Sequence, residues 1–306
     1  AGGPSELDRF LSGALPDKFQ ASVGRYGMSF FRNPPSTFAP GNAIPVGPDY
    51  VIGPGDSFRI DVWGMVQGTW NVTVDRNGQV AIPTVGTLGV AGLTFDQLKS
   101  TISRELNKYY AGFEMNITMG QLRSIKVYVT GHAKKPGAYT LSALSTLVNA
   151  LLSCGGPSET GTLRDIVVNR NGKAVAHFDM YDFLMKGDKT KDIRLQPEDV
   201  IHINRVGPLA AIVGNVRVPA IYELKKETAI SDLLEMAGGL TYTGFNGRVQ
   251  VYRVTNNEYR SILEGDLMDL ATKPDKNFAL ADGDFVRVFS VVEKLNVMTI
   301  SGPVAK

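Results

Sequence analysis

The chain has 306 residues, enough for two or three compact domains that each bury a core. Its 32 Lys and Arg residues nearly balance 30 Asp and Glu residues. The formal net charge of +2 excludes the strong global field that draws a protein to nucleic acid or an anionic membrane. The single cysteine, Cys154, excludes an intramolecular disulfide and argues against a cysteine-rich zinc site.

Residues 1–48 are expected to form an arm ahead of the first domain. Ser5–Leu15 has helical spacing of its apolar residues, and the following proline-rich segment predicts an extended chain that runs over the surface. Three aromatic residues are the expected anchors of this arm: Phe30, Phe31 and Phe38. The opening residues AGGPSELDRF lack the features of a signal peptide, which leaves two readings, a cytosolic protein or one whose signal has been removed.

Residues 49–123 are expected to form a small α+β domain. The alternation in SFRIDVW, residues 57–63, predicts a half-buried strand, and Asn77-Gly78 predicts a tight turn between two paired strands. Thr94 is placed to cap a helix, with Gln97 closing a capping box. The apolar stripe of that helix consists of Phe95, Leu98, Ile102 and Leu106.

The chain repeats itself after residue 124. Gly131 and Gly214 are 83 residues apart, and so are Pro136 and Pro219 in the segments VYVTGHAKKPGAYTL and AIVGNVRVPAIYEL. Each copy predicts a strand, a turn, a strand, a helix, a hairpin, a short helical segment and a final strand. The expected modules cover residues 124–206 and 207–290, and a third begins at 291–306, which predicts a fragment of a longer protein.

These patterns predict an elongated α+β chain. About four strands wrapped on one helix in roughly 80 residues is typical of a β-grasp fold. In each module the first helix should end at a Gly-Gly pair, where a glycine can adopt the left-handed conformation that closes a helix. The four glycines are Gly155, Gly156, Gly238 and Gly239.

Several segments resemble those of bacterial outer-membrane polysaccharide export proteins. YVIGPGDSFRIDVWG and VDRNGQVAIPTVGTLGVAGLTFDQL resemble the polysaccharide export domain of that family. The repeats, with VTGHAKKPGAY, CGGPSE and LQPEDVIHI, resemble the soluble-ligand-binding β-grasp (SLBB) modules that follow it, in the longer multi-module type. The resemblance covers essentially the whole chain.

The resemblance implies a bacterial periplasmic protein that is associated with the outer membrane and whose signal peptide has been removed. It implies a homo-oligomeric ring through which capsular or exopolysaccharide passes, and an inner-membrane polysaccharide copolymerase that docks below. Better-understood members carry a lipidation cysteine near the N-terminus and a C-terminal membrane helix, and the sequence shows neither. The resemblance therefore does not assign lipid anchoring or membrane insertion to any residue of this sequence.

The turn Gly53-Pro54-Gly55-Asp56 raises the question of a nucleotide site. A phosphate loop requires a helix and a lysine directly after it, whereas here a strand follows. Asp199 and Asp284 occupy the same place before the equivalent strands of the two modules. Because an aspartate in such a turn can accept backbone N–H bonds, the pattern predicts a recurring structural turn into a strand.

No residue pattern predicts an enzyme, a cofactor or a metal site. The pairs Asp179/Asp182 and Asp266/Asp269 could hold a cation, but their position before short apolar segments favours helix capping. The histidines, His132, His177 and His202, lie at no metal-ligand spacing.

Basic residues in the first turn of each module are the candidate glycan contacts: Lys134, Lys135 and Arg217. If these loops face a lumen, they would touch an anionic glycan through weak, screened contacts. Aromatic residues could instead stack on sugars, although packing explains them equally well: Trp63, Trp70, Tyr109 and Tyr110.

Two other functions remain open at this point. One is a monomeric periplasmic carbohydrate-binding or scaffold module that links the copolymerase to the exporter without forming the conduit. The other is a small-ligand β-grasp protein, of the kind that binds cobalamin or serves in electron transfer, which would require a large apolar pocket.

Overall fold

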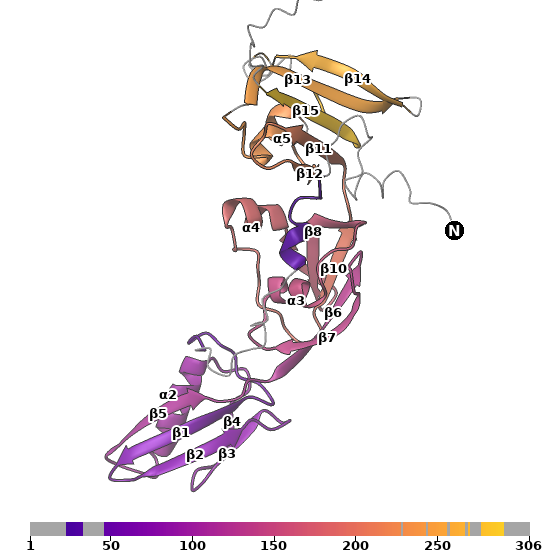
Figure 1. Cartoon of the computed structure of the whole chain (residues 1–306). Coiled ribbons are helices and arrows are strands. Elements are labelled where there is room, and N and C mark those ends of the chain that lie inside the picture. The colour runs from indigo at the N-terminus through magenta and orange to yellow at the C-terminus, as the bar shows by residue number, and fades with distance from the viewer. Residues whose placement is uncertain are drawn as a thin grey trace, which may run out of the picture.

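The computed structural model describes residues 23–32, 46–227, 229–242, 244–255, 258–266, 269 and 277–290. Three sheet-containing units follow one another along an elongated molecule (Figure 1). We call them the first domain, the first module and the second module, in chain order. The helix expected at Ser5–Leu15, Phe38 and the expected start of a third module all lie outside the described residues.

The first domain is built on a three-stranded antiparallel sheet. Strand β1 (Ser57–Gly64) pairs with β2 (Gly68–Thr73) on one side and with β5 (Phe113–Met119) on the other. Helix α2 (Phe95–Leu106) covers one face and buries the predicted stripe: Phe95, Leu98, Ile102 and Leu106. The capping box is confirmed, since the Thr94 hydroxyl accepts the Gln97 N–H and the Gln97 side chain accepts the Thr94 N–H.

The hairpin predicted around Asn77-Gly78 is wrong. The turn is present, but β2 pairs only with β1, while β3 (Gln79–Ile82) pairs with β4 (Gly86–Gly89) in a separate two-stranded sheet. Only Gly78 has a positive φ (76°), whereas a type I′ turn needs two such residues. The Asp75 carboxylate accepts the N–H groups of Asn77 and Gln79 and so directs the chain out of one sheet and into the other.

The first module is a five-stranded sheet with the order β7-β6-β10-β8-β9. The central pair β6–β10 is parallel and the other pairs are antiparallel. Its elements are β6 (Ser124–Gly131), β7 (Gly137–Ser142), α3 (Leu147–Ser153), β8 (Gly161–Arg170), β9 (Lys173–Phe178), α4 (Met180–Lys186) and β10 (Val200–Arg205).

The second module repeats this sheet with the order β12-β11-β15-β13-β14, and its central pair β11–β15 is again parallel. Its elements are β11 (Leu209–Gly214), β12 (Ala220–Glu223), α5 (Ile230–Met236), β13 (Gly244–Thr255), β14 (Glu258–Gly265) and β15 (Asp284–Ser290). The chain is therefore an α+β protein in which one domain precedes tandem modules of β-grasp type.

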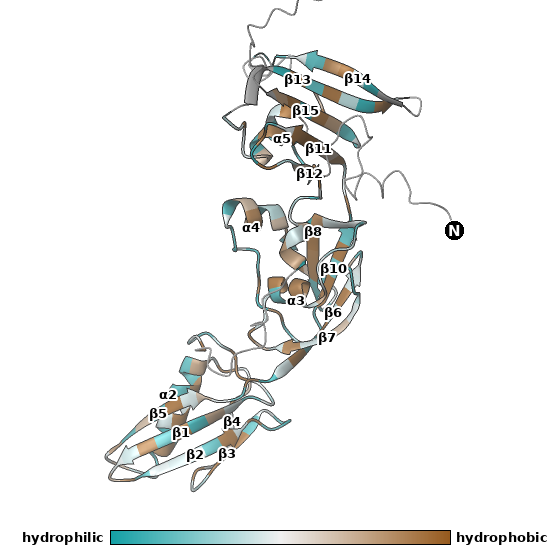
Figure 2. Ribbon diagram, viewed as in Figure 1, coloured by the Kyte–Doolittle hydropathy of each residue, from teal (hydrophilic) through white to brown (hydrophobic). Residues whose placement is uncertain are grey.

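The cores of the two modules lie between their sheets and short helices. Figure 2 shows hydrophobic residues concentrated on α3 and on the strands β8 and β11, and nearly every residue of β11 is buried. Cys154 is fully buried at the end of α3, as expected of a small apolar residue. Within the described residues, no helix is long and apolar enough to cross a membrane.

The longer of the two described pieces of the arm, residues 23–32, lies between the two modules (Figure 1). We call this segment, Val23–Arg32, the strap. It contains the 3-10 turn η2 (Met28–Phe31). Of the expected aromatic anchors, Phe31 is buried and Phe30 is partly buried against Phe31 and Phe183.

The helix cap of the first domain yields a first prediction. Replacing Thr94→Ala removes the acceptor for the Gln97 N–H and should lower the free energy of unfolding by about 1 kcal/mol. Both tryptophans of the chain lie in this domain, so urea denaturation followed by tryptophan fluorescence reports on it alone.

The matched control for this cap is Ser100→Ala, which removes an exposed hydroxyl from the middle of the same helix. It should leave the urea midpoint unchanged or slightly raised, because alanine is the better helix former. Equal midpoints for Thr94→Ala and the wild type would contradict the role given to the capping box.

Candidate functional site

Most of the buried charge in the described part of the chain gathers in two kinds of place. No group of three or more His, Cys, Asp or Glu side chains lies close enough to hold a metal ion among the residues that the structure describes. The two places are a turn that recurs in all three units and a polar cluster between the two modules, while Asp192 is buried separately, where it accepts the Val148 N–H at the start of α3.

The Gly53-Pro54-Gly55-Asp56 turn holds a fully buried carboxylate. Asp56 Oδ2 accepts the Gly53 N–H at 2.9 Å, while Oδ1 accepts the Tyr50 hydroxyl at 2.7 Å and the Arg123 N–H at 2.9 Å. The Arg123 guanidinium forms an ion pair with the same carboxylate. Burial is the largest cause that raises the pKa of Tyr50, and its hydrogen bond to Asp56 adds to it.

The same arrangement occurs in both modules. Asp199 accepts the Gln196 N–H and both Nε and Nη2 of Arg170, each at 2.8 Å. Asp284 accepts the Ala281 N–H at 2.8 Å and two Arg253 donors at 2.7 Å. All three aspartates are 0% exposed.

Sequence reasoning missed the arginine partner of each aspartate. A signal existed, since Arg170 and Arg253 are 83 residues apart, the spacing of the repeat. Each arginine also donates to a backbone carbonyl near the aspartate, on Val51, Arg194 or Ala279. The turn therefore joins a loop to the sheet through a buried ion pair, and its donors are all supplied by the chain itself.

The Gly-Gly pairs close helices α3 and α5. Gly155, Gly156, Gly238 and Gly239 all have φ between 75° and 82°, a left-handed conformation that suits glycine. The Gly156 carbonyl accepts the N–H of Lys134, and the Gly239 carbonyl accepts the N–H of Arg217. The first-turn loop of each module is thereby held over the end of its helix.

This arrangement places the candidate glycan contacts on the surface. Lys134, Lys135 and Arg217 are exposed, and Arg217 Nε donates to the Leu240 carbonyl at 3.4 Å. Lys134 and Arg217 occupy equivalent positions in the first-turn loops of the two modules. A role toward glycan stays a prediction.

The remaining polar candidates do not converge. Asp179 caps α4, as predicted, by accepting the Tyr181 N–H, while Asp182 pairs with Lys186 on the surface. The segment after Asp266 lies largely outside the described residues. Each histidine contacts a different partner: Thr160 for His132, Asp165 for His177 and Thr130 for His202.

The junction between the modules centres on Glu223, which is 2% exposed at the end of β12. Its carboxylate accepts hydrogen bonds from Thr162 Oγ1, from the N–H groups of Leu163 and Gly207, and from Arg25 Nη2. These donors come from the first module, from the linker between β10 and β11 that contains Gly207, and from the strap. A single buried carboxylate thus ties three separate segments together.

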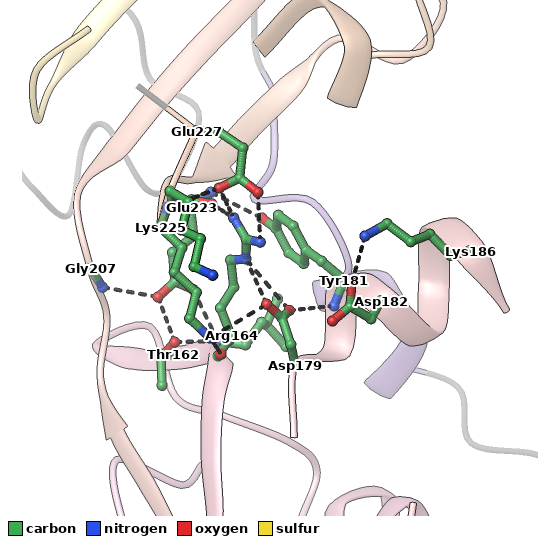
Figure 3. Close-up of polar contacts among 12 residues, drawn as sticks. Thr162, Arg164, Asp179, Tyr181, Asp182, Lys186, Gly207, Glu223, Lys225 and Glu227 are labelled. Atoms are coloured by element: carbon green, nitrogen blue, oxygen red, sulfur yellow. Dashed lines mark hydrogen bonds and ion pairs between the residues drawn. The ribbon is translucent and has the colours of Figure 1, made fainter. Parts of the chain in front are cut away.

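Arg164 on β8 forms the second half of this junction (Figure 3). Its guanidinium donates to both oxygens of Glu227 at 2.7 and 3.1 Å, to the Glu223 carbonyl at 3.0 Å and to Asp179. The guanidinium also lies 4.7 Å from the centre of the Tyr181 ring. Lys225 Nζ in turn donates to the Arg164 carbonyl at 2.8 Å. Planar bidentate pairing of this kind fixes relative orientation as well as distance.

The carboxylates around Arg164 respond to it differently. Burial acts to raise the pKa of Glu227, but the hydrogen bonds and charge of Arg164 outweigh burial and lower it to about 2. Burial raises the pKa of Asp179 despite the opposing charge of Arg164. Tyr181, whose hydroxyl accepts the Glu223 N–H, has its pKa raised by burial.

Comparison with known proteins gives the domains a family. Residues 44–120 match the polysaccharide biosynthesis/export protein family, and residues 125–203 and 209–268 each match the SLBB domain. The chain is 27% identical over 244 residues to the polysialic acid transport protein KpsD of Escherichia coli, which covers 76% of this chain and 44% of that protein. The chain therefore spans less than half the length of KpsD.

A second relative is the EPS I polysaccharide export outer membrane protein EpsA of Ralstonia solanacearum. The two are 26% identical over 272 residues, which cover 79% of this chain and 70% of that protein. The names of both relatives describe transport or export of a polysaccharide.

The recurring ion pair yields a second prediction. Replacing Arg170→Ala leaves Asp199 buried and charged with one backbone donor, which should destabilise the first module by roughly 3 kcal/mol, the low end for a broken buried pair. Hydrogen exchange of the β8 and β10 amides measures the loss. The control Lys173→Ala truncates an exposed side chain of the same hairpin and should change exchange little; equal protection in both variants would contradict the assignment.

Acid should weaken the junction through Glu227. Its folded pKa of about 2 lies below its ordinary value of 4.5, so its stabilising contribution is complete above pH 4.5 and is lost as the pH falls toward 2. Thermal unfolding midpoints measured between pH 5 and 2 should therefore fall less steeply for Glu227→Gln than for the wild type. Parallel plots of unfolding midpoint against pH for the two proteins would show that protonation of Glu227 does not contribute to the loss of stability in acid.

Proposed function

Because this chain belongs to the polysaccharide export proteins, with an export domain followed by two SLBB domains, we propose that it forms the periplasmic part of an outer-membrane channel for capsular or exopolysaccharide. The observation that carries the proposal is the order of the three domain matches, which run without a large gap from residue 44 to 268. The relatives named for polysaccharide transport support it.

The proposed mechanism is a conduit that acts by shape. Identical chains pack side by side in a closed ring, and the three units of each chain then contribute successive layers of the wall. The elongated arrangement of the units supports such a stack (Figure 1). A hydrated polymer passes through without a tight binding site, since strong binding at one place would stall transport.

The partners follow from this role. The polymer in transit touches the wall through weak contacts, for which Lys134, Lys135 and Arg217 are the candidate residues. An inner-membrane polysaccharide copolymerase delivers the polymer from below. The protein acts in the periplasm at the outer membrane, as a non-enzymatic component that uses no cofactor or metal.

Electron microscopy and genetics together test this function. The full-length protein, extracted from the bacterium that encodes it, should form rings, and its deletion should abolish surface polysaccharide. Monomers at every concentration, together with normal surface polysaccharide in the deletion strain, would contradict the proposal. A monomer that binds a defined oligosaccharide would instead support a scaffold that links the copolymerase to the exporter.

The basic loops provide a residue-level prediction. The triple variant Lys134→Ala, Lys135→Ala and Arg217→Ala should fold normally, because the N–H groups of Lys134 and Arg217 that bind the helix ends are retained. With an anionic polymer we expect a modest fall in export, no more than about fivefold, that disappears at high salt. The control is Lys173→Ala with Lys226→Ala, two exposed lysines outside the first-turn loops. Equal export by both variants would contradict a role for these three residues in contacting the glycan.

A further inference from the structure

The strap binds in the angle between the two modules, although it precedes the first domain in the sequence. Its residues Val23, Arg25 and Phe31 are buried, and Tyr26 is partly buried. Such burial is unusual for a segment with a single 3-10 turn of its own, so its stability must come from the two modules that it touches.

On the side of the second module, the strap extends the sheet. Tyr26 N–H donates to the Ile221 carbonyl at 2.9 Å, and Ile221 N–H donates to the Gly24 carbonyl at 3.0 Å. The strap thus pairs with β12, the edge strand of that sheet, in the manner of an added strand. Val23 packs beside this bridge in an apolar cluster that includes Ile221 and Phe285.

On the side of the first module, the strap donates hydrogen bonds to backbone carbonyl groups and packs an aromatic ring against a glycine. Arg25 donates to the carbonyls of Glu159 at 3.1 Å and Gly161 at 2.5 Å. The Phe31 ring lies against Gly156, at the place that a side-chain carbon would fill. At the equivalent Gly239 of the second module, no atom of the described residues lies within 4 Å of that place, so a ring occupies the site in the first module and not in the second.

Two strap residues touch both modules at once. Arg25 Nη2 reaches the Gly161 carbonyl of the first module and the Glu223 carboxylate of the second, and the two charged side chains are 4% and 3% exposed. The Tyr26 ring stacks on Tyr222 of the second module at 5.1 Å and meets Tyr181 of the first edge-on at 5.2 Å. A change in the angle between the modules would break these contacts.

We propose that the angle between the modules is a peptide-binding site, and that the strap of the same chain occupies it as a latch that holds the modules in one fixed alignment. The site recognises an extended backbone at the edge of β12, a guanidinium between Gly161 and Glu223, and an aromatic ring over Gly156. The latch acts within one chain and does not depend on the channel role proposed above.

Distance measurements on the full chain test the latch. Spin labels attached at Lys173→Cys on β9 and Glu235→Cys on α5 lie on different modules, at exposed positions away from the strap. Cys154 is buried and should stay unlabelled. The chain with its native strap should give a single narrow distance distribution, because the latch permits one alignment.

Two strap variants should release the latch. Arg25→Ala removes the buried link to Glu223, and Phe31→Ala empties the pocket over Gly156. Both should broaden the distance distribution, and the amides of Tyr26 and Ile221 should exchange about 100-fold faster. Amides of β8 and β13 in the module cores should keep their protection, which shows that the modules themselves remain folded.

The matched control is Ser29→Ala, an exposed strap residue that should change neither the distribution nor the exchange. Unchanged distributions and unchanged Ile221 exchange in both Arg25→Ala and Phe31→Ala would overturn the latch. A narrow distribution that broadens on dilution of the native chain would assign the bound strap to a second copy, and would overturn a latch that acts within one chain.

Discussion

The alignment of the two modules depends on the burial of one carboxylate. Glu223 cannot be removed from water at the module junction unless its oxygens are paired, and the donors come from the first module, the linker and the strap. Because the donors belong to three segments, the charge is satisfied only when all three are in place. The buried guanidinium of Arg164 likewise needs its acceptors on Asp179 and Glu227. The junction therefore favours one arrangement of the two modules, whereas a purely apolar contact would let them slide past each other.

Each unit also fixes its own interior with a buried ion pair. Asp56, Asp199 and Asp284 are each bound by a guanidinium and by a backbone N–H three residues earlier. The same ion pair occurs in units of different topology. We infer that in each unit it anchors the turn that leads into a strand of the sheet. Rigid units joined by a specific junction suit the proposed channel wall, which would have to keep its shape while a polymer passes.

The sequence predicted what local spacing encodes and missed what distant segments build. The helix cap at Thr94 and the glycine-ended helices follow from patterns within about 15 residues, the repeat follows from similar segments 83 residues apart, and the structure contains all three. The turn at Gly78 was recognisable, but turn chemistry does not say which strands pair across it, and the predicted hairpin was wrong. Glu223 and Arg164 were not singled out from the sequence, because the hydrogen bonds that join the two modules through them connect residues about 60 positions apart.

The strap reverses the usual relation between synthesis and folding. Arg25 leaves the ribosome early, yet its partner Glu223 lies 198 residues later in the chain. The first domain and the modules can fold from contacts within themselves, whereas the strap has no place to bind until both modules have formed. The strap therefore adopts its bound conformation last, although it is the first described segment of the chain.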